Sequence, residues 1–119
     1  MSTQLGVKLE RIISFGYRYG NPPQQAPGVV IIDVRKMFNN PYHDRKLRNM
    51  RGTDLAVQEE VMRTPHFDTL YNHLIEKVTA PGVEIAYIGC TGGHHRSVFL
   101  ALKLAKQLGV QCEHRDINK

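Results

Sequence analysis

The sequence VEIAYIGCTGGHHRSVFLALKLAKQL, residues 83–108, places an apolar run, a glycine-rich turn and an amphipathic run in direct succession. This order predicts a buried strand, a tight turn and a helix. Backbone N–H groups at the start of such a helix converge on one point, where the helix dipole favours a negative charge. The guanidinium of Arg96 adds a planar donor that matches phosphate oxygens. The residues predicted to bind phosphate are Cys90, Thr91, Gly92, Gly93, His94, His95, Arg96 and Ser97.

The rest of the chain alternates between strand and helix patterns. Val29–Val34 is a continuous β-branched run, which is typical of a strand buried on both faces of its sheet. Residues 35–52 are polar and basic without periodicity, so they predict a long loop. Thr64 is the expected N-cap of a helix that has Pro65 at its first position. Strands are predicted within 7–19, 29–34, 83–88 and 110–116, and helices within 53–63, 65–80 and 98–108.

Strands that alternate with helices indicate an α/β fold: a layered single domain, residues 1–119, with a mostly parallel sheet flanked by helices. Ligands of such sheets bind beyond the carboxyl ends of the strands. Asp33 and Arg35 follow one predicted strand, and the glycine-rich turn follows another. We therefore expect a phosphate-type strand-turn-helix at the carboxyl end of the sheet.

The composition is that of a soluble globular protein with a basic bias. The 119 residues carry a formal charge of +5, and the isoelectric point is about 9.4. This charge favours an anionic partner, a phosphorylated metabolite or a nucleic acid, although a charge of +5 is also common on the surface of a small soluble domain. Two cysteines make no disulfide framework, and no signal peptide or long apolar run is present. We expect a cytoplasmic protein with no membrane partner.

Enzymatic and metal-binding interpretations of the turn are also open. Cys90 and Arg96 match the Cys-x5-Arg-Ser loop of cysteine-dependent phosphatases, in which a thiolate attacks phosphorus and the arginine binds the equatorial oxygens. Gly89 stands where those enzymes have histidine, and no general-acid loop is evident, so a buried, inert cysteine is favoured. Cys112 and His114 complete no common zinc spacing with the turn, and no Walker motif occurs. We expect no metal, no cofactor and no catalytic residue.

Three separated segments together resemble the C-terminal domain of the RapZ family of RNase adapter proteins. They are residues 14–20 (SFGYRYG), Asp33-Val34-Arg35 with Asn40-Pro41-Tyr42 and Leu47-Arg48, and residues 89–98 (GCTGGHHRSV). The resemblance covers nearly the whole chain from Arg11. Complete members of the family carry an N-terminal P-loop ATPase domain, so the likeness is to a stand-alone C-terminal module.

The resemblance implies a function for this module. It implies an α/β fold, binding of glucosamine-6-phosphate as a metabolite signal, binding of small regulatory RNA, and self-association into a homo-oligomer. Inorganic phosphate or sulfate would occupy the same place as the phosphate of the sugar. By position, Asp33 and Arg35 would lie across the crevice from the turn, and Tyr42 would belong to the sugar-facing contacts, although Tyr42-His43 departs from the family pattern.

The predicted long loop is the candidate for RNA binding. Asp44 is the only acidic residue among the basic residues of this loop. Tyrosines in or near the loop would stack on bases if they were exposed. A solvated basic surface explains the same pattern equally well. The family's basic C-terminal tail is reduced here to Arg115 and Lys119, which argues against strong RNA binding. The candidate RNA-binding residues are Lys36, Arg45, Lys46, Arg48 and Arg51, together with Arg35.

Overall fold

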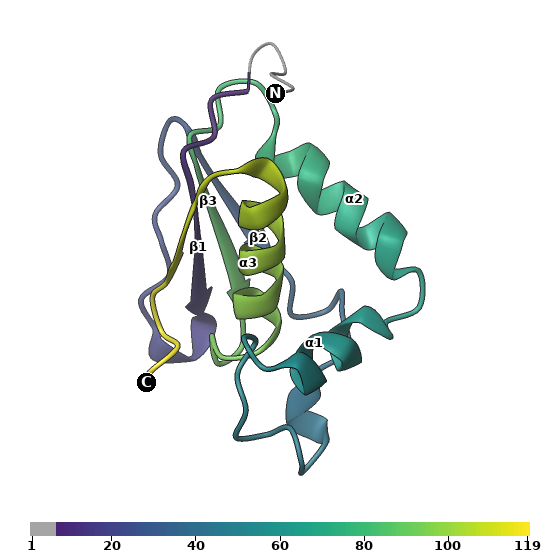
Figure 1. The fold of residues 1–119 in the computed structure, drawn as a ribbon. Coiled ribbons are helices and arrows are strands. Elements are labelled where there is room, and N and C mark those ends of the chain that lie inside the picture. The colour runs from purple at the N-terminus through teal and green to yellow at the C-terminus, as the bar shows by residue number, and fades with distance from the viewer. Residues whose placement is uncertain (1–6) are drawn as a thin grey trace.

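A computed structural model describes residues 7–119 as an α/β fold with one sheet of four parallel strands and three helices (Figure 1). The strand order in the sheet is β2-β3-β1-β4, and every neighbouring pair is parallel. This confirms the predicted fold class. The strands are β1 (Arg11–Gly16), β2 (Val29–Asp33), β3 (Ile85–Cys90) and β4 (Gln111–His114), and the helices are α1 (Leu55–Met62), α2 (Phe67–Val78) and α3 (Arg96–Leu108).

The helices α2 and α3 cover one face of the sheet. Alternate strand residues on this face, among them Ile12, Ile32 and Ile88, belong to one buried cluster with Leu74 of α2 and Leu100 of α3. In Figure 1, α3 lies across the middle of the sheet. Because strand side chains alternate between faces, this single cluster fixes the register in which the helices pack on the sheet. No helix within residues 7–119 is long and apolar enough to cross a membrane.

The opposite face of the sheet is covered by aromatic side chains rather than by a helix. The ring of Phe15 lies edge-on to Tyr17 and to Tyr87, with centroid distances of 4.8 and 6.2 Å. The guanidinium of Arg115 lies over the same ring. These contacts bury Phe15 completely without a second helical layer.

The strand β2 differs from its predicted environment. The apolar run at residues 29–34 predicted a strand buried on both faces, but β2 lies at the edge of the sheet and only its Ile32 is fully buried. An uninterrupted apolar run indicates a strand but contains no information on strand order. The chain returns through α1 and α2 to place β3 on one side of β2, and no later strand pairs with its other side.

The boundaries of the helices show a second difference. Thr64 is not the N-cap of α2, because α2 begins at Phe67 and is preceded by His66 in the left-handed region, with φ of 61°. The hydroxyl of Thr64 instead donates to the carbonyl of Val61 at 2.6 Å and accepts from the backbone N–H of Asn39 at 2.8 Å. It ends α1 and ties the long loop to it. Residues 35–52 contain one 3-10 turn, Pro41–His43, and are otherwise non-regular, as predicted for a loop.

Candidate functional site: a cavity lined by cations at the carboxyl edge of the sheet

The glycine-rich turn lies between β3 and α3 and is held against the end of β1. Gly93 has φ of 72°, which L side chains rarely adopt, and a Cβ there would lie 2.8 Å from the backbone nitrogen of Gly16. Gly16 and Cys90 are partners in the parallel register of β1 and β3. The backbones of the turn and of β1 therefore touch directly, and this contact sets the position of the helix start.

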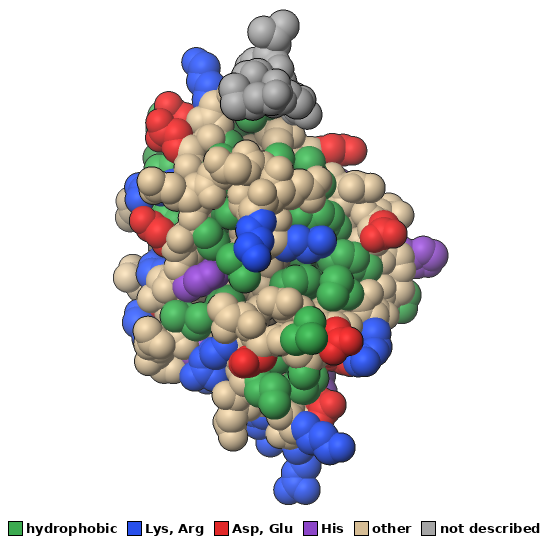
Figure 2. Space-filling view, in the orientation of Figure 1, with side chains coloured by type: hydrophobic (Ala, Val, Ile, Leu, Met, Phe, Trp, Pro, Cys, Tyr) green, Lys and Arg blue, Asp and Glu red, His purple; other side chains and the backbone are tan. Residues whose placement is uncertain are grey.

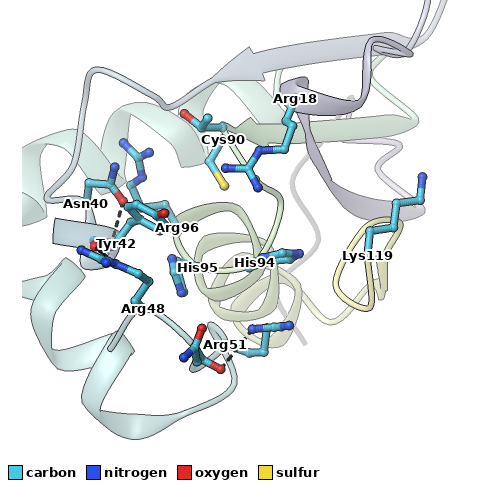
Figure 3. Close-up of a pocket in the computed structure, with 13 residues that line it drawn as sticks. Arg18, Asn40, Tyr42, Arg48, Arg51, Cys90, His94, His95, Arg96 and Lys119 are labelled. Carbon is cyan, nitrogen blue, oxygen red and sulfur yellow. Dashed lines mark hydrogen bonds between the residues drawn. The ribbon is translucent and has the colours of Figure 1, made fainter. Parts of the chain in front are cut away.

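A cavity of about 470 Å³ opens beside this turn (Figure 3). The turn forms one wall, the loop between β2 and α1 forms the opposite wall, and single residues after β1 and at the C-terminus close the remaining sides. The turn contributes Cys90, Thr91, Gly92, His94, His95 and Arg96; the loop contributes Asn40, Tyr42, Arg48, Asn49 and Arg51; Arg18 and Lys119 complete the lining.

Arg96 is the most buried charged group of the cavity. Its side chain is 3% exposed, and its Nη1 donates to the carbonyl of Arg35 at 2.6 Å. Its Nε has no hydrogen-bond partner within residues 7–119. Burial lowers the pKa of Arg96, while the neighbouring Cys90 and Asp33 act to raise it. An arginine nevertheless stays protonated in proteins, so the cavity contains a buried cation with a free donor.

The two histidines of the turn are also partly withdrawn from solvent. His95 is 7% exposed, and its Nε2 has no hydrogen-bond partner within the described chain. Burial lowers the pKa of His95 and also that of His94, and nearby Arg51 adds to the effect at both. The Tyr19 hydroxyl lies 3.4 Å from the Nε2 of His94. Burial and the charge of Arg51 both favour the neutral form of the two rings.

Cys90 is directed toward the protein interior as well as the cavity. It is 2% exposed, and its thiol donates to the hydroxyl of the fully buried Ser97 at 3.1 Å. Ser97 and Gly93, both in the predicted phosphate set, lie behind the cavity and not on its surface. They support the turn from the side of α3 and β1.

Asp33 and Arg35 bind each other instead of facing the cavity. Their side chains form a salt bridge of 2.7 Å, and the Arg35 guanidinium lies 3.9 Å from the centroid of the Tyr17 ring. Hydrogen bonding to Arg35 lowers the pKa of Asp33 despite partial desolvation. Neither side chain lines the cavity, and the link between Arg35 and the site is its backbone carbonyl, which accepts from Arg96.

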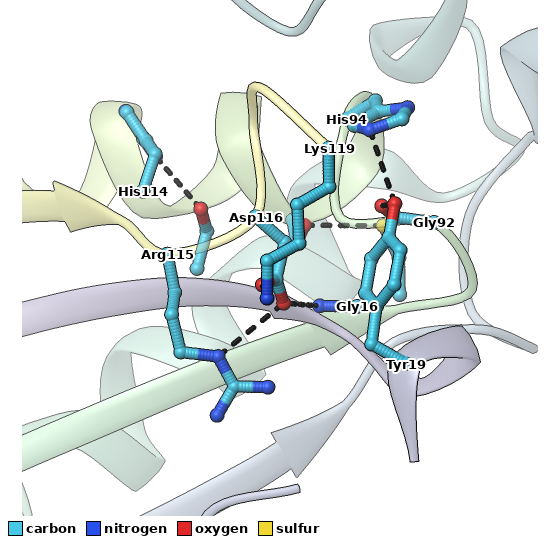
Figure 4. A network of polar contacts seen from close by, with 11 residues as sticks. Gly16, Tyr19, Gly92, His94, His114, Arg115, Asp116 and Lys119 are labelled. Atoms are coloured by element: carbon cyan, nitrogen blue, oxygen red, sulfur yellow. Dashed lines mark hydrogen bonds and ion pairs between the residues drawn. The ribbon is translucent and has the colours of Figure 1, made fainter. Parts of the chain in front are cut away.

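The C-terminal residues form one wall of the cavity through a buried carboxylate (Figure 4). Asp116 is fully buried; its Oδ2 accepts from the backbone N–H of Gly16 at 2.8 Å, and its Oδ1 lies 2.7 Å from Nζ of Lys119. Burial by itself would raise the pKa of Asp116, but the bonds from Lys119 and Gly16 together lower it. A further bond of 2.9 Å runs from Nε of Arg51 to the carbonyl of Ile117.

Apart from Arg35, which is paired with Asp33, the predicted RNA-binding residues divide into two groups. Arg48 and Arg51 line the cavity, whereas Lys36, Arg45 and Lys46 are exposed outside it. Figure 2 shows Lys and Arg side chains gathered at the lower end of the molecule, where the loop between β2 and α1 lies in Figure 1. Tyr42 is 47% exposed, and the Arg48 guanidinium lies 4.6 Å from the centroid of its ring.

Four cavity residues were not predicted from the sequence as site residues: Arg18, Asn40, Asn49 and Lys119. Arg18 and Asn40 stand in segments that carry the family resemblance, so those segments contained a usable signal. Lys119 reaches the site only because Asp116 holds the C-terminus against β1. No local sequence pattern indicates that contact.

Fold and site together define an α/β domain with a cavity lined by cationic side chains at the carboxyl edge of a parallel sheet. The family model described as the RapZ C-terminal domain matches residues 9–118, and the chain belongs to this family. Three similar proteins, each named nucleotide-binding protein, come from Pediococcus pentosaceus, Pseudothermotoga lettingae and Limosilactobacillus fermentum. They are 38%, 40% and 40% identical over 91%, 92% and 91% of this chain. The chain spans 40–42% of the length of these relatives.

Proposed function

We propose that this chain is a regulatory binding module whose cavity holds a phosphorylated metabolite of the amino-sugar phosphate class, such as glucosamine-6-phosphate. Membership in the RapZ C-terminal domain family supports a regulatory binding role. The observation that carries the phosphate assignment is the pair of buried nitrogens, Nε of Arg96 and Nε2 of His95, that have no partner within residues 7–119. Buried polar groups in proteins are almost always hydrogen-bonded, so these two nitrogens in the lining of one cavity favour an anionic ligand there.

The binding mode follows from the positions of these groups. The phosphate oxygens accept hydrogen bonds from Arg96 and from the backbone N–H groups at the start of α3, where the helix dipole is positive. The side-chain amides of Asn40 and Asn49 lie on the opposite wall and offer donors and acceptors to sugar hydroxyls. The amino group of the sugar is suggested by the family resemblance rather than by a carboxylate in the cavity.

Calorimetric titration of the protein with four compounds tests the proposal: glucosamine-6-phosphate, glucose-6-phosphate, glucosamine and inorganic phosphate. We expect both sugar phosphates to bind more tightly than inorganic phosphate and glucosamine alone not to bind. A higher affinity for glucosamine-6-phosphate than for glucose-6-phosphate supports the amino-sugar assignment. Failure of all three phosphates to bind would contradict the proposal.

Small RNA is the second proposed ligand, on the exposed basic surface of the loop between β2 and α1. Lys36, Arg45 and Lys46 are exposed there and make no ion pair within the described residues, and Tyr42 is an exposed residue of the same loop. Fluorescence anisotropy with a labelled RNA hairpin, measured at several salt concentrations, tests this. We expect the affinity to fall steeply with salt and to fall further in the Arg45→Gln, Lys46→Gln double variant. A salt-independent affinity would contradict phosphate-backbone binding.

We propose binding without catalysis. The contact between Cys90 and Ser97 is compatible with a phosphatase loop, but Cys90 is buried and no carboxylic acid within residues 7–119 lines the cavity to protonate a leaving group. We expect no turnover of an aryl phosphate. Turnover that disappears in Cys90→Ser would contradict the proposal and support the enzymatic alternative.

Self-association is the last part of the proposal and is suggested only by the family resemblance. Sedimentation velocity over a range of protein concentrations, with and without glucosamine-6-phosphate, tests it. A monomer at every concentration would contradict it without affecting the phosphate assignment.

A further inference from the structure

The arginines of this protein divide into two classes by their partners. Outside the cavity, an arginine typically has a carboxylate within salt-bridge distance, at 2.7–3.3 Å. These pairs are Arg11–Glu113, Arg35–Asp33, Arg63–Glu60 and Arg115–Asp116. The remaining arginines have no carboxylate partner within residues 7–119, and all of them except Arg45 line the cavity: Arg18, Arg48, Arg51 and Arg96.

The partners of the cavity arginines are neutral. Arg96 donates to one backbone carbonyl, Arg48 donates to the carbonyl of Tyr42 at 3.0 Å, and Arg51 donates to the carbonyls of residues 49, 50 and 117. The Arg18 guanidinium has no hydrogen-bond partner in the described chain. Carbonyl oxygens orient a guanidinium but leave its positive charge uncompensated. No aspartate or glutamate of residues 7–119 lines the cavity.

The positive charge in the cavity exceeds what one phosphate group neutralises. A phosphate monoester carries a charge of about −1.5 to −2 at pH 7, whereas four arginines are directed at the cavity from three different segments (Figure 3). One phosphate beside the buried Arg96, here called the inner end, leaves without an anion the exposed guanidiniums of Arg18, beside Cys90, and of Arg48, beside Tyr42, here called the outer guanidiniums (Figure 3). A volume of about 470 Å³ accommodates a ligand much larger than a single phosphate.

We infer that the cavity selects small metabolites with two phosphoryl groups, one at the inner end beside Arg96 and His95, and the other between Arg18 and Arg48. This inference rests on the proposed function: the inner phosphoryl group takes the place proposed there for the phosphate of the sugar, and the second phosphoryl group is additional. The two phosphoryl groups can be joined as a diphosphate or separated by a sugar ring, and either arrangement brings two anionic groups to the arginines of the cavity. A small ligand is favoured over an internal RNA phosphodiester, because Arg96 is buried at the inner end and an internal phosphodiester remains attached to its chain on both sides.

Matched pairs of ligands test the inference by calorimetry. Glucose-6-phosphate is compared with glucose-1,6-bisphosphate, and AMP with ADP, on the wild type and on three variants. Arg18→Gln and Arg48→Gln each remove one outer guanidinium. Lys106→Gln removes the same charge from an exposed side chain near the end of α3 and is the control for net charge. A doubly phosphorylated dinucleotide, pApA, represents an RNA 5′ end.

We expect a second phosphoryl group to raise the affinity at least about tenfold in one of the two pairs, the gain that one charge-assisted hydrogen bond gives. The ratio of the two affinities should fall toward one in Arg18→Gln and Arg48→Gln, and should not change in Lys106→Gln. The pair that shows the gain distinguishes a separated bisphosphate from a joined diphosphate.

Other outcomes would overturn the inference. If monophosphates bind and the second phosphoryl group adds nothing, this inference fails while the proposed function stands. If the gain is equal in the wild type and in both outer variants, the second group does not lie between Arg18 and Arg48. Tighter binding of pApA than of every small bisphosphate would assign the outer guanidiniums to RNA instead. If no phosphate compound binds, the proposed function fails as well.

Discussion

Replacement of Arg96 by glutamine separates the roles of the buried guanidinium in folding and in binding. The shorter glutamine side chain ends at the place of the arginine Nε, so it loses the bond that Nη1 now donates to the carbonyl of Arg35 at 2.6 Å and contributes no charge to the cavity. Charge-assisted hydrogen bonds are worth about 1.5–3 kcal/mol each. Loss of two such bonds to the phosphate therefore weakens binding by about 3 kcal/mol or more, which is a factor of at least about 100.

Thermal unfolding with glucosamine-6-phosphate measures this loss. A ligand at about 100 times its dissociation constant stabilises the wild type by about 2.7 kcal/mol, which corresponds to a shift of roughly 10 °C for a domain of this length. At the same ligand concentration, Arg96→Gln should retain about 0.3 kcal/mol of stabilisation, a shift of only about 1 °C. The Lys106→Gln variant, which removes a charge outside the cavity, should keep the full shift.

The unliganded melting temperature of the Arg96→Gln variant shows whether the substitution has damaged the fold. Burial disfavours the charged guanidinium and lowers the pKa of Arg96, which offsets part of the loss of its bond to the carbonyl of Arg35, so the substitution should cost no more than about 1.5–3 kcal/mol of stability. A full ligand-induced shift in Arg96→Gln would refute the reasoning, because the buried guanidinium would then make no contact with the phosphate. A variant that is unfolded without ligand would refute the assignment of Arg96 as a binding group with a minor structural role.

Three further predictions concern the support of the cavity. Gly93→Ala should lower the free energy of unfolding in urea by about 2–4 kcal/mol, because φ is 72° and the added Cβ meets the backbone of Gly16; Gly109→Ala, at φ of 69° with open space around it, should cost only about 1–2 kcal/mol. Equal costs at the two glycines would show that the turn does not press on β1. Burial lowers the pKa of His95 below its unfolded value, so stability should be complete above pH 6.5 and fall as the pH drops from there toward the folded pKa; His95→Asn should reduce this slope, and an unchanged slope would exclude a contribution of His95. Asp116→Asn should lower the free energy of unfolding by about 1.5–3 kcal/mol and weaken phosphate binding, since it breaks the ion pair that holds the C-terminal wall; calorimetry that finds unaltered affinity would show that this wall is not needed.

The strand-turn-helix around the glycine pair was predictable because its information is local. Strand, glycine pair and helix follow one another within residues 83–108, and backbone geometry alone directs the N–H groups at the start of α3 toward one side. The alternation of strands and helices likewise predicted a parallel sheet, which the strand pairing confirms. The exact start of α2 was not predictable in the same way, because the hydroxyl of Thr64 can either cap the start of α2 or bond to the end of α1. The contact with Asn39 accompanies the second of these arrangements.

The opposite wall of the cavity depends on contacts between distant segments. The environment of β2 depends on which strand pairs with its outer edge, and an apolar run such as residues 29–34 does not specify this. The positions of Arg18 and Lys119 depend on the closeness of the end of β1 and the C-terminus, which the buried carboxylate of Asp116 brings together. Asp33 and Arg35 had the right location in the chain, yet their opposite charges satisfy each other at 2.7 Å. Charge alone does not decide whether a residue faces a ligand or a neighbour.

The cavity keeps its positive charge because the guanidiniums of its arginines, unlike those paired with a carboxylate elsewhere in the protein, have only neutral hydrogen-bond partners. The loop between β2 and α1 is joined to the turn by a backbone bond of 2.7 Å from Gly52 to the carbonyl of His94, and to the C-terminus by the bond from Arg51 to the carbonyl of Ile117. Both joints use neutral acceptors, so they hold the walls together without consuming charge. A salt bridge at either joint would stabilise the wall but would place a carboxylate beside the phosphate and oppose its binding. The arrangement therefore joins the walls and leaves the cations of the cavity without a carboxylate partner. Substitution of Asn49 by Asp, which puts a carboxylate in the lining, should weaken the proposed phosphate binding without loss of the fold.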